Sequence, residues 1–136
     1  MISILLVDDE VSVIKIGTAI LERFGYNVVS KRQGMEALHL FRKNPHGFDL
    51  VITDYAMPGM KGDELAAEIR LIRKDIPLIL CTGHTAISES CLRNWGFDAI
   101  LLKPFRFREM ARIVDRNIKR EKKRSEGGLA NTSRLF

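Results

Sequence analysis

Five short apolar runs alternate with stretches of helical periodicity along the first 120 residues of the chain. The runs are apolar at nearly every position, which is typical of strands in a parallel sheet that is covered on both faces. They occupy residues 2–7, 26–29, 50–53, 77–82 and 99–102. Between them, apolar residues recur every three or four positions, as at Met110, Val114 and Ile118, which predicts amphipathic helices. The alternation predicts an α/β fold: a flavodoxin-like, doubly wound, five-stranded parallel sheet of order 2-1-3-4-5 with five helices.

The length of the chain, 136 residues, fits one domain of ordinary size. Its longest apolar runs have about four residues, far fewer than the roughly 20 that cross a bilayer, and its first residues lack the features of a signal peptide. We therefore expect no membrane insertion and a cytoplasmic location. The two cysteines, Cys81 and Cys91, are not at metal-ligand spacing and are expected to be reduced thiols.

Positive charge is concentrated near the C-terminus. The chain has a net charge of +5, and from Lys119 onward six lysines and arginines outnumber two glutamates. The helical pattern ends near Arg120, so residues 1–120 are predicted to form the domain and 121–136 a flexible basic tail. A basic run of this kind is typical of a solvated linker, with weak phosphate contacts as the alternative. No unit that reads DNA bases follows it, so sequence-specific DNA binding is not expected.

Polar side chains follow four of the five apolar runs. Asp8 and Asp9 follow the first run, Asp54 the third, Thr82 ends the fourth and Lys103 follows the fifth. Ligands of a doubly wound sheet bind outside the carboxyl ends of its strands. These residues are therefore expected to share one site at that edge.

The residue types in this group suit phosphoryl transfer. Neighbouring carboxylates repel one another unless a cation joins them, and hard oxygen ligands suit Mg²⁺. The ion would keep Asp54 ionised and able to act as a nucleophile, while Lys103 and the hydroxyl of Thr82 would meet phosphoryl oxygens. Each residue alone has an ordinary explanation as a helix cap, a turn residue or a solvated lysine. The combination at four strand ends favours a phosphoryl-transfer site.

Four motifs, in order along the chain, resemble the receiver domain of two-component response regulators. They are Leu-Leu-Val-Asp-Asp-Glu at 5–10, Phe-Asp-Leu-Val-Ile-Thr-Asp-Tyr-Ala-Met-Pro-Gly-Met-Lys-Gly at 48–62, Cys-Thr-Gly at 81–83 and Leu-Lys-Pro-Phe at 102–105. The resemblance extends over about residues 2–120, and residues 34–70 look especially similar to receivers of hybrid sensor histidine kinases. It implies a signalling domain rather than an enzyme in its own right.

The resemblance implies that Asp54 is the phosphoacceptor, loaded from a histidine of a sensor kinase or of a phosphotransfer protein. Asp9 and Asp54 would bind Mg²⁺ together with the backbone carbonyl of Ala56, and Asp8 would act through water. Phosphorylation would change contacts with a downstream effector protein, and slow self-dephosphorylation would end the signal.

The same resemblance implies that Thr82 and Lys103 contact the phosphoryl oxygens and that the Lys103–Pro104 peptide is cis. Family members usually carry Tyr or Phe three residues before the lysine, where this chain has Ile100. Readout by a turning aromatic ring is therefore not expected, and the signal is expected to run through residues 82–87. His84 lies where the family tunes self-dephosphorylation, and a passive role at the rim of the site is favoured for it.

A surface on the fourth helix, fifth strand and fifth helix is the expected place for a homodimer or an effector. Arg93, Ile100 and Arg112 would share it. Trp95, near the end of the fourth helix, is expected to cover the sheet edge partly and to lie remote from the phosphoacceptor.

Two other functions share parts of the pattern. An aspartate-nucleophile phosphatase would also use Mg²⁺, but such enzymes usually carry a second carboxylate two residues after the nucleophile, where this chain has Ala56. A flavodoxin-like nucleotide or flavin module would need glycines in the first strand–helix turn, and residues 8–12 are acidic and lack them. The receiver function is therefore the prediction, with the phosphatase as the alternative.

Overall fold

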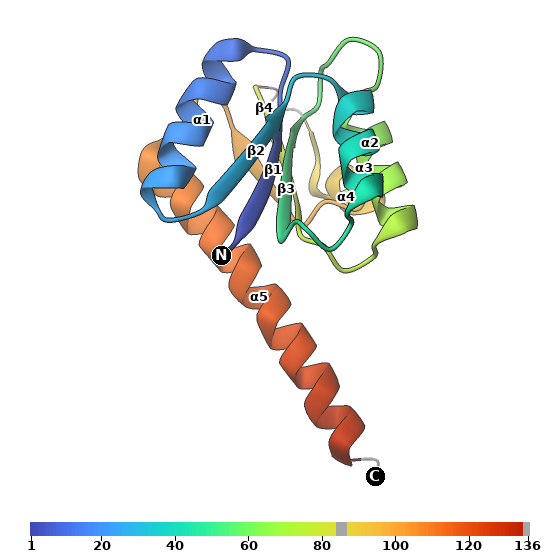
Figure 1. Cartoon of the computed structure of the whole chain (residues 1–136). Helices are drawn as coiled ribbons and strands as arrows, with labels where there is room; N and C mark the ends of the chain where they lie inside the picture. The colour runs from blue at the N-terminus through green and yellow to red at the C-terminus, as the bar shows by residue number, and fades with distance from the viewer. Residues whose placement is uncertain (84–86, 135–136) are drawn as a thin grey trace.

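The computed structural model describes residues 1–83 and 87–134, with side chains described through residue 124 in the last helix. Strands and helices alternate along the chain (Figure 1). In order they are β1 (Ser3–Val7), α1 (Val11–Arg23), β2 (Asn27–Lys31), α2 (Gly34–Lys43), β3 (Leu50–Asp54), α3 (Gly62–Ile72), β4 (Leu78–Thr82), α4 (Glu89–Asn94), β5 (Ala99–Leu102) and α5 (Phe107–Arg134).

The five strands form one parallel sheet of order β2-β1-β3-β4-β5. Each connection between consecutive strands passes through one helix, as parallel neighbours require. The predicted fold class and strand order are therefore confirmed. Because the strands run the same way, their carboxyl ends lie along one edge of the sheet.

Helices cover both faces of the sheet (Figure 1). Side chains of α1 and α5, including Leu21, Met110 and Val114, pack with one face in a single apolar cluster. Side chains of α2, α3 and α4 form a second cluster on the other face. Every residue of β3 and β4 is buried, which explains why these strands appear in the sequence as unbroken apolar runs.

The last helix extends farther than the sequence predicts. The backbone is helical to Arg134, and Figure 1 shows the end of α5 standing away from the sheet. The sequence analysis predicted a flexible tail at 121–136, whereas the described backbone of 121–134 is helical. The turns that pack on the sheet supply a helical nucleus, so further residues add without the cost of nucleation, and Asp115 pairs with Lys119 one turn later at 3.0 Å. The domain boundary at residue 120 stays a prediction.

None of the helices in the described part of the chain combines the length and apolarity that a membrane span requires. Cys81 is buried in β4 and Cys91 is half-buried in α4, and both are free thiols.

Candidate functional site

Four strand ends bring polar side chains to one edge of the sheet. Val7 is paired with Thr53, so Asp8 lies beside Asp54 across the β1–β3 boundary. Asp54 in turn is paired with Cys81, and Thr82 with Leu102. Asp8, Asp54, Thr82 and Lys103 therefore follow one another along this edge, as the strand pattern predicts.

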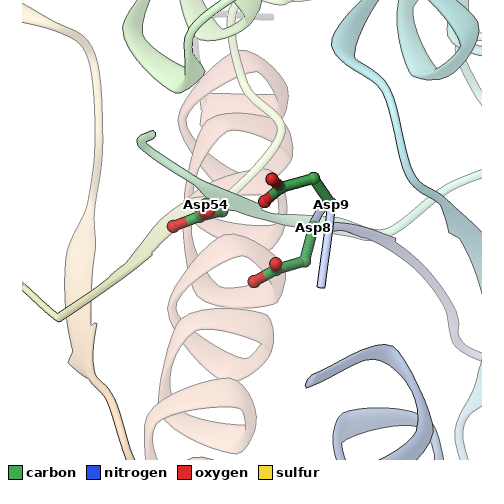
Figure 2. Close-up of side chains that lie close together, drawn as sticks. All are labelled: Asp8, Asp9 and Asp54. Atoms are coloured by element: carbon green, nitrogen blue, oxygen red, sulfur yellow. The ribbon is translucent and has the colours of Figure 1, made fainter. Parts of the chain in front are cut away.

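Three carboxylates gather at the centre of this edge (Figure 2). Asp8, Asp9 and Asp54 each offer one oxygen, and these oxygens lie within 4.8 Å of one another. Asp8 and Asp54 are buried, whereas Asp9 is half-buried. Buried negative charges this close are stable only with a cation or a proton between them.

Lys103 reaches into the carboxylate group from the end of β5. Its Nζ lies 2.8 Å from Oδ2 of Asp8, 3.2 Å from Oδ1 of Asp54 and 3.9 Å from Oε1 of Glu10. Burial lowers the pKa of Lys103, but the hydrogen bond to Asp8 and the charge of Asp54 outweigh it, and the pKa is raised overall. The lysine thus carries a fixed positive charge at the site. The peptide that joins it to Pro104 is cis, as the resemblance implied.

The environment of Asp54 changes how readily its carboxyl group ionises. Burial, followed by the charge of Asp8, raises its pKa to about 6, although Lys103 and the backbone N–H of Tyr55 act in the opposite direction. That N–H donates to Oδ1 of Asp54 at 2.9 Å. A second positive charge would relieve the remaining repulsion and keep Asp54 ionised at neutral pH.

The donor set fits a hard divalent cation. All three clustered groups offer carboxylate oxygens, which Mg²⁺ prefers to nitrogen or sulfur. Among the described residues, Oδ2 of Asp8 meets Lys103 and accepts no further hydrogen bond. The cluster, in which the pKa of Asp54 is raised and an oxygen of Asp8 has room for a further partner, is therefore suited to Mg²⁺.

The sequence also predicted positions at the site for Thr82, Ala56 and His84. Thr82 is buried at the end of β4, and its carbonyl accepts from the N–H of Lys103 at 2.9 Å. Ala56 is exposed in the loop after β3, and its role as a backbone ligand stays a prediction. His84 and part of the 82–87 segment lie outside the described residues.

Three supporting residues escaped the sequence analysis. A Cβ on Gly62, the first residue of α3, would collide with the carbonyl oxygen of Asp54. The side chain of Arg32 donates to the carbonyl of Asp9 from two nitrogens, at 3.4 and 3.1 Å. The ring of Tyr55 stacks on Trp95. Gly62 ends the receiver-like motif at 48–62, which was a signal for it, but nothing in the sequence pointed to Arg32 or to the stack.

Comparison with known families gives a clear match. The family model described as the response regulator receiver domain matches residues 4–115. The chain is 32% identical over 133 residues to the Two-component response regulator ARR10 of Arabidopsis thaliana, covering 96% of this chain and 24% of that protein. It is 32% identical over 122 residues to the Sensor kinase CckA of Brucella abortus (strain 2308), covering 88% of this chain and 13% of that protein. The chain thus spans about a quarter of the first relative and less of the second.

Solved structures agree with the family match. A response regulator receiver domain protein from Clostridium thermocellum superposes with a TM-score of 0.83 at 29% identity, over 90% of this chain and 98% of that one. The response regulator TrrA of Thermotoga maritima, solved in complex with Mg²⁺ and BeF, has a TM-score of 0.78 at 37% identity, over 86% of this chain and 99% of that one.

Proposed function

The chain belongs to the family of response regulator receiver domains, and from this premise we propose that Asp54 accepts the phosphoryl group through which the domain signals. The observation that carries the proposal is the position of its carboxylate, 3.2 Å from Lys103 and clustered with Asp8 and Asp9. Incubation of the purified chain with acetyl phosphate and Mg²⁺, followed by intact-mass measurement, tests it. The expected product carries one added phosphoryl group.

In the proposed step a carboxylate oxygen of Asp54 attacks phosphorus as the bond from phosphorus to the donor breaks. With a phosphohistidine donor, the imidazole nitrogen leaves with the electron pair of that bond. Lys103, already charged, would meet the oxygens that gain negative charge, and we assign the hydroxyl of Thr82 a second contact with them. Asp8, Asp9, Asp54 and the carbonyl of Ala56 would hold the ion. Bound Mg²⁺ would supply neutralisation of the phosphoryl oxygens.

A mostly apolar hollow beside Lys103 supports a protein as the donor. It has a volume of about 400 Å³ and lies between the start of α1 and the β5–α5 turn, where Val13, Ile16 and Phe105 line it. Ile16, in α1, is 54% exposed, so an apolar side chain faces solvent at this hollow. We propose that a sensor histidine kinase or a phosphotransfer protein rests on this hollow and presents its phosphohistidine to Asp54.

The remaining predictions about partners and location belong to this proposal. We propose a cytoplasmic domain that switches contacts with a downstream effector protein and does not read DNA sequence. A homodimer through α4, β5 and α5 stays a prediction. Arg93 and Arg112 are exposed there, whereas Ile100 packs partly against the apolar core and is a weaker anchor than the sequence indicated.

The phosphatase alternative is not favoured. The position two residues after Asp54 holds Ala56, which has no group that can protonate a leaving alcohol. The family match is to a signalling domain.

Stabilisation by Mg²⁺ is expected to weaken as the pH falls through about 6, the raised pKa of Asp54. Below that pH a proton competes with the cation for the same carboxylate. Without Mg²⁺ the dependence has the opposite sign: the folded state binds the proton more tightly than the unfolded state, so this group makes the fold more stable as the pH falls from 6 toward 4. Thermal unfolding with and without Mg²⁺, at neutral and mildly acidic pH, measures both effects.

The matched control is Asp54→Asn, in which the titrating group is gone. Its thermal unfolding should respond little to Mg²⁺ and should lack the step near pH 6. A wild-type response to Mg²⁺ that is the same on both sides of pH 6 would show that Asp54 is not a ligand.

A further inference from the structure

An aromatic stack connects the residue after Asp54 to the end of α4. The backbone N–H of Tyr55 donates to Oδ1 of Asp54 at 2.9 Å. The ring of Tyr55 lies on the ring of Trp95, with centroids 5.2 Å apart and planes inclined by 11°. Trp95 is the residue at which α4 ends. A single hydrogen bond and a single ring contact therefore separate the carboxylate of Asp54 from the α4–β5 turn.

The turn that carries Trp95 is held firmly from its other side. Gly96 adopts the left-handed conformation, with φ of 84°, and its carbonyl accepts from Nε and Nη2 of Arg70 at 3.1 and 2.7 Å. Nη2 of Arg70 also pairs with Asp98 at 3.0 Å, and Asp98 accepts from the N–H of Leu78. Because α3 and β4 fix this turn, a shift of Tyr55 changes the geometry of the stack rather than carrying the turn along freely.

Loading of Asp54 must disturb the hydrogen bond of Tyr55. In the unphosphorylated chain, Oδ1 of Asp54 accepts from the N–H of Tyr55 and also pairs with Nζ of Lys103. A phosphoryl group on the carboxylate takes one oxygen into a covalent bond and draws Lys103 toward its own oxygens. The charge on the oxygen that faces Tyr55 therefore changes, and the Tyr55 peptide with it.

On this basis, and resting on Asp54 as the phosphoacceptor, we propose that Tyr55 and Trp95 are positioning residues: Tyr55 relays the state of Asp54 to the ring of Trp95, which the fixed α4–β5 turn holds in place. Ile100, in β5, packs in the same apolar cluster and has no ring that could turn. The stack supplies an aromatic element at another place in that cluster. Coupling is reciprocal, so the stack also alters how tightly Asp54 holds its ligand.

The single tryptophan of the chain makes the relay measurable. The wild-type chain is titrated with beryllofluoride, a non-covalent mimic of a phosphoryl group on aspartate, at saturating Mg²⁺. We expect a change in Trp95 emission and a shift of its one indole N–H cross-peak in NMR spectra. Tyr55→Leu should lose most of both changes and alter the half-saturating beryllofluoride concentration about twofold to tenfold, the usual contribution of an aromatic pair. Tyr55→Phe, which keeps the ring, should retain them.

Tyr26→Leu is the matched control, because Tyr26 is the other tyrosine and packs in the cluster on the opposite face of the sheet. It should respond as the wild type does. If Tyr55→Leu does not unfold cooperatively, Tyr55→Met replaces it, since an unbranched side chain adapts to the same space.

Intact mass after acetyl phosphate treatment separates the two proposals. A wild type that gains no phosphoryl mass overturns the role of Asp54. A wild type that gains it without any response of Trp95 overturns the relay alone, and so does a full Trp95 response in Tyr55→Leu. Phosphoryl mass gain in Tyr55→Leu with a silent Trp95 supports the relay, because a purely structural stack would not uncouple the two readouts.

Discussion

Asp54→Asn is expected to abolish uptake of the phosphoryl group from acetyl phosphate, with no mass gain under conditions in which the wild type is fully converted. The amide oxygen carries no negative charge and is a far weaker nucleophile toward phosphorus than a carboxylate. Asp8 and Asp9 lie near enough to Asp54 to share a cation with it. Only Asp54 has an oxygen, Oδ1, that both the N–H of Tyr55 and Nζ of Lys103 contact in the described part of the chain. They are not expected to replace it.

The same substitution separates loss of function from loss of fold. Burial and the charge of Asp8 raise the pKa of Asp54, so the ionised side chain costs folding free energy at neutral pH. The neutral amide removes that cost, and the free energy of unfolding should rise by about 1 kcal/mol. Asp115→Asn, at a half-exposed position of α5, is the control and should be phosphorylated normally. Phosphoryl uptake by Asp54→Asn would assign the acceptor to another residue.

Most of the fold follows from features that are local in sequence. Apolar runs without polar interruption predict strands buried on both faces, and β3 and β4 are of this kind. The edge strand was predicted less well. The apolar run at 26–29 missed Ser30 and Lys31, which β2 includes because an edge strand tolerates polar, partly exposed residues. No apolar periodicity in the sequence predicts the extension of α5 to Arg134, and Figure 1 shows the backbone of those turns standing away from the sheet.

The composition of the site was predictable for a topological reason. Parallel strands end at one edge, so polar residues that follow separate strands converge whatever their distance along the chain. The pairing within the site was not predictable. Nζ of Lys103 lies closer to the carboxylate of Asp8 than to that of Asp54. This difference depends on side-chain geometry, which the order of the strands does not determine. The stack of Trp95 on Tyr55, the residue after the acceptor, was also not predictable, because it depends on how the end of α4 packs against the loop after β3.

Gly62→Ala is expected to damage both the fold and the acceptor. A Cβ at this position would overlap the carbonyl oxygen of Asp54 and lie 3.0 Å from the carbonyl carbon of Asp54 and from Cα of Tyr55. These are backbone atoms, so no flexible side chain can move away. The N–H of Gly62 also donates to the carbonyl of Tyr55 at 2.9 Å, which fixes the start of α3 against the end of β3.

The helix and the acceptor strand must therefore separate to admit one methyl group. Overpacking of this kind costs about 1–3 kcal/mol of unfolding free energy, which thermal or urea unfolding measures directly. The backbone of Asp54 and Tyr55 would move with it, so the initial rate of phosphoryl uptake should fall more than the stability loss alone explains. A displacement of about 1 Å can cost on the order of 100-fold in a positioned reaction.

Gly83→Ala is the control for Gly62→Ala, because it adds a methyl group next to the site without crowding any described backbone atom. Gly83 follows Thr82 directly, yet no described atom lies within 4 Å of the position that its Cβ would take, and its φ is not in the left-handed region. Its unfolding free energy should stay within about 0.5 kcal/mol of the wild type.

If Gly62→Ala were as stable as Gly83→Ala and as quickly phosphorylated, the close approach of α3 would not be what holds Asp54 in place. If it were destabilised yet fully active, the approach would serve the fold alone. The expected result, a loss of stability together with a larger loss of rate, follows only if one backbone contact positions the helix and the acceptor together.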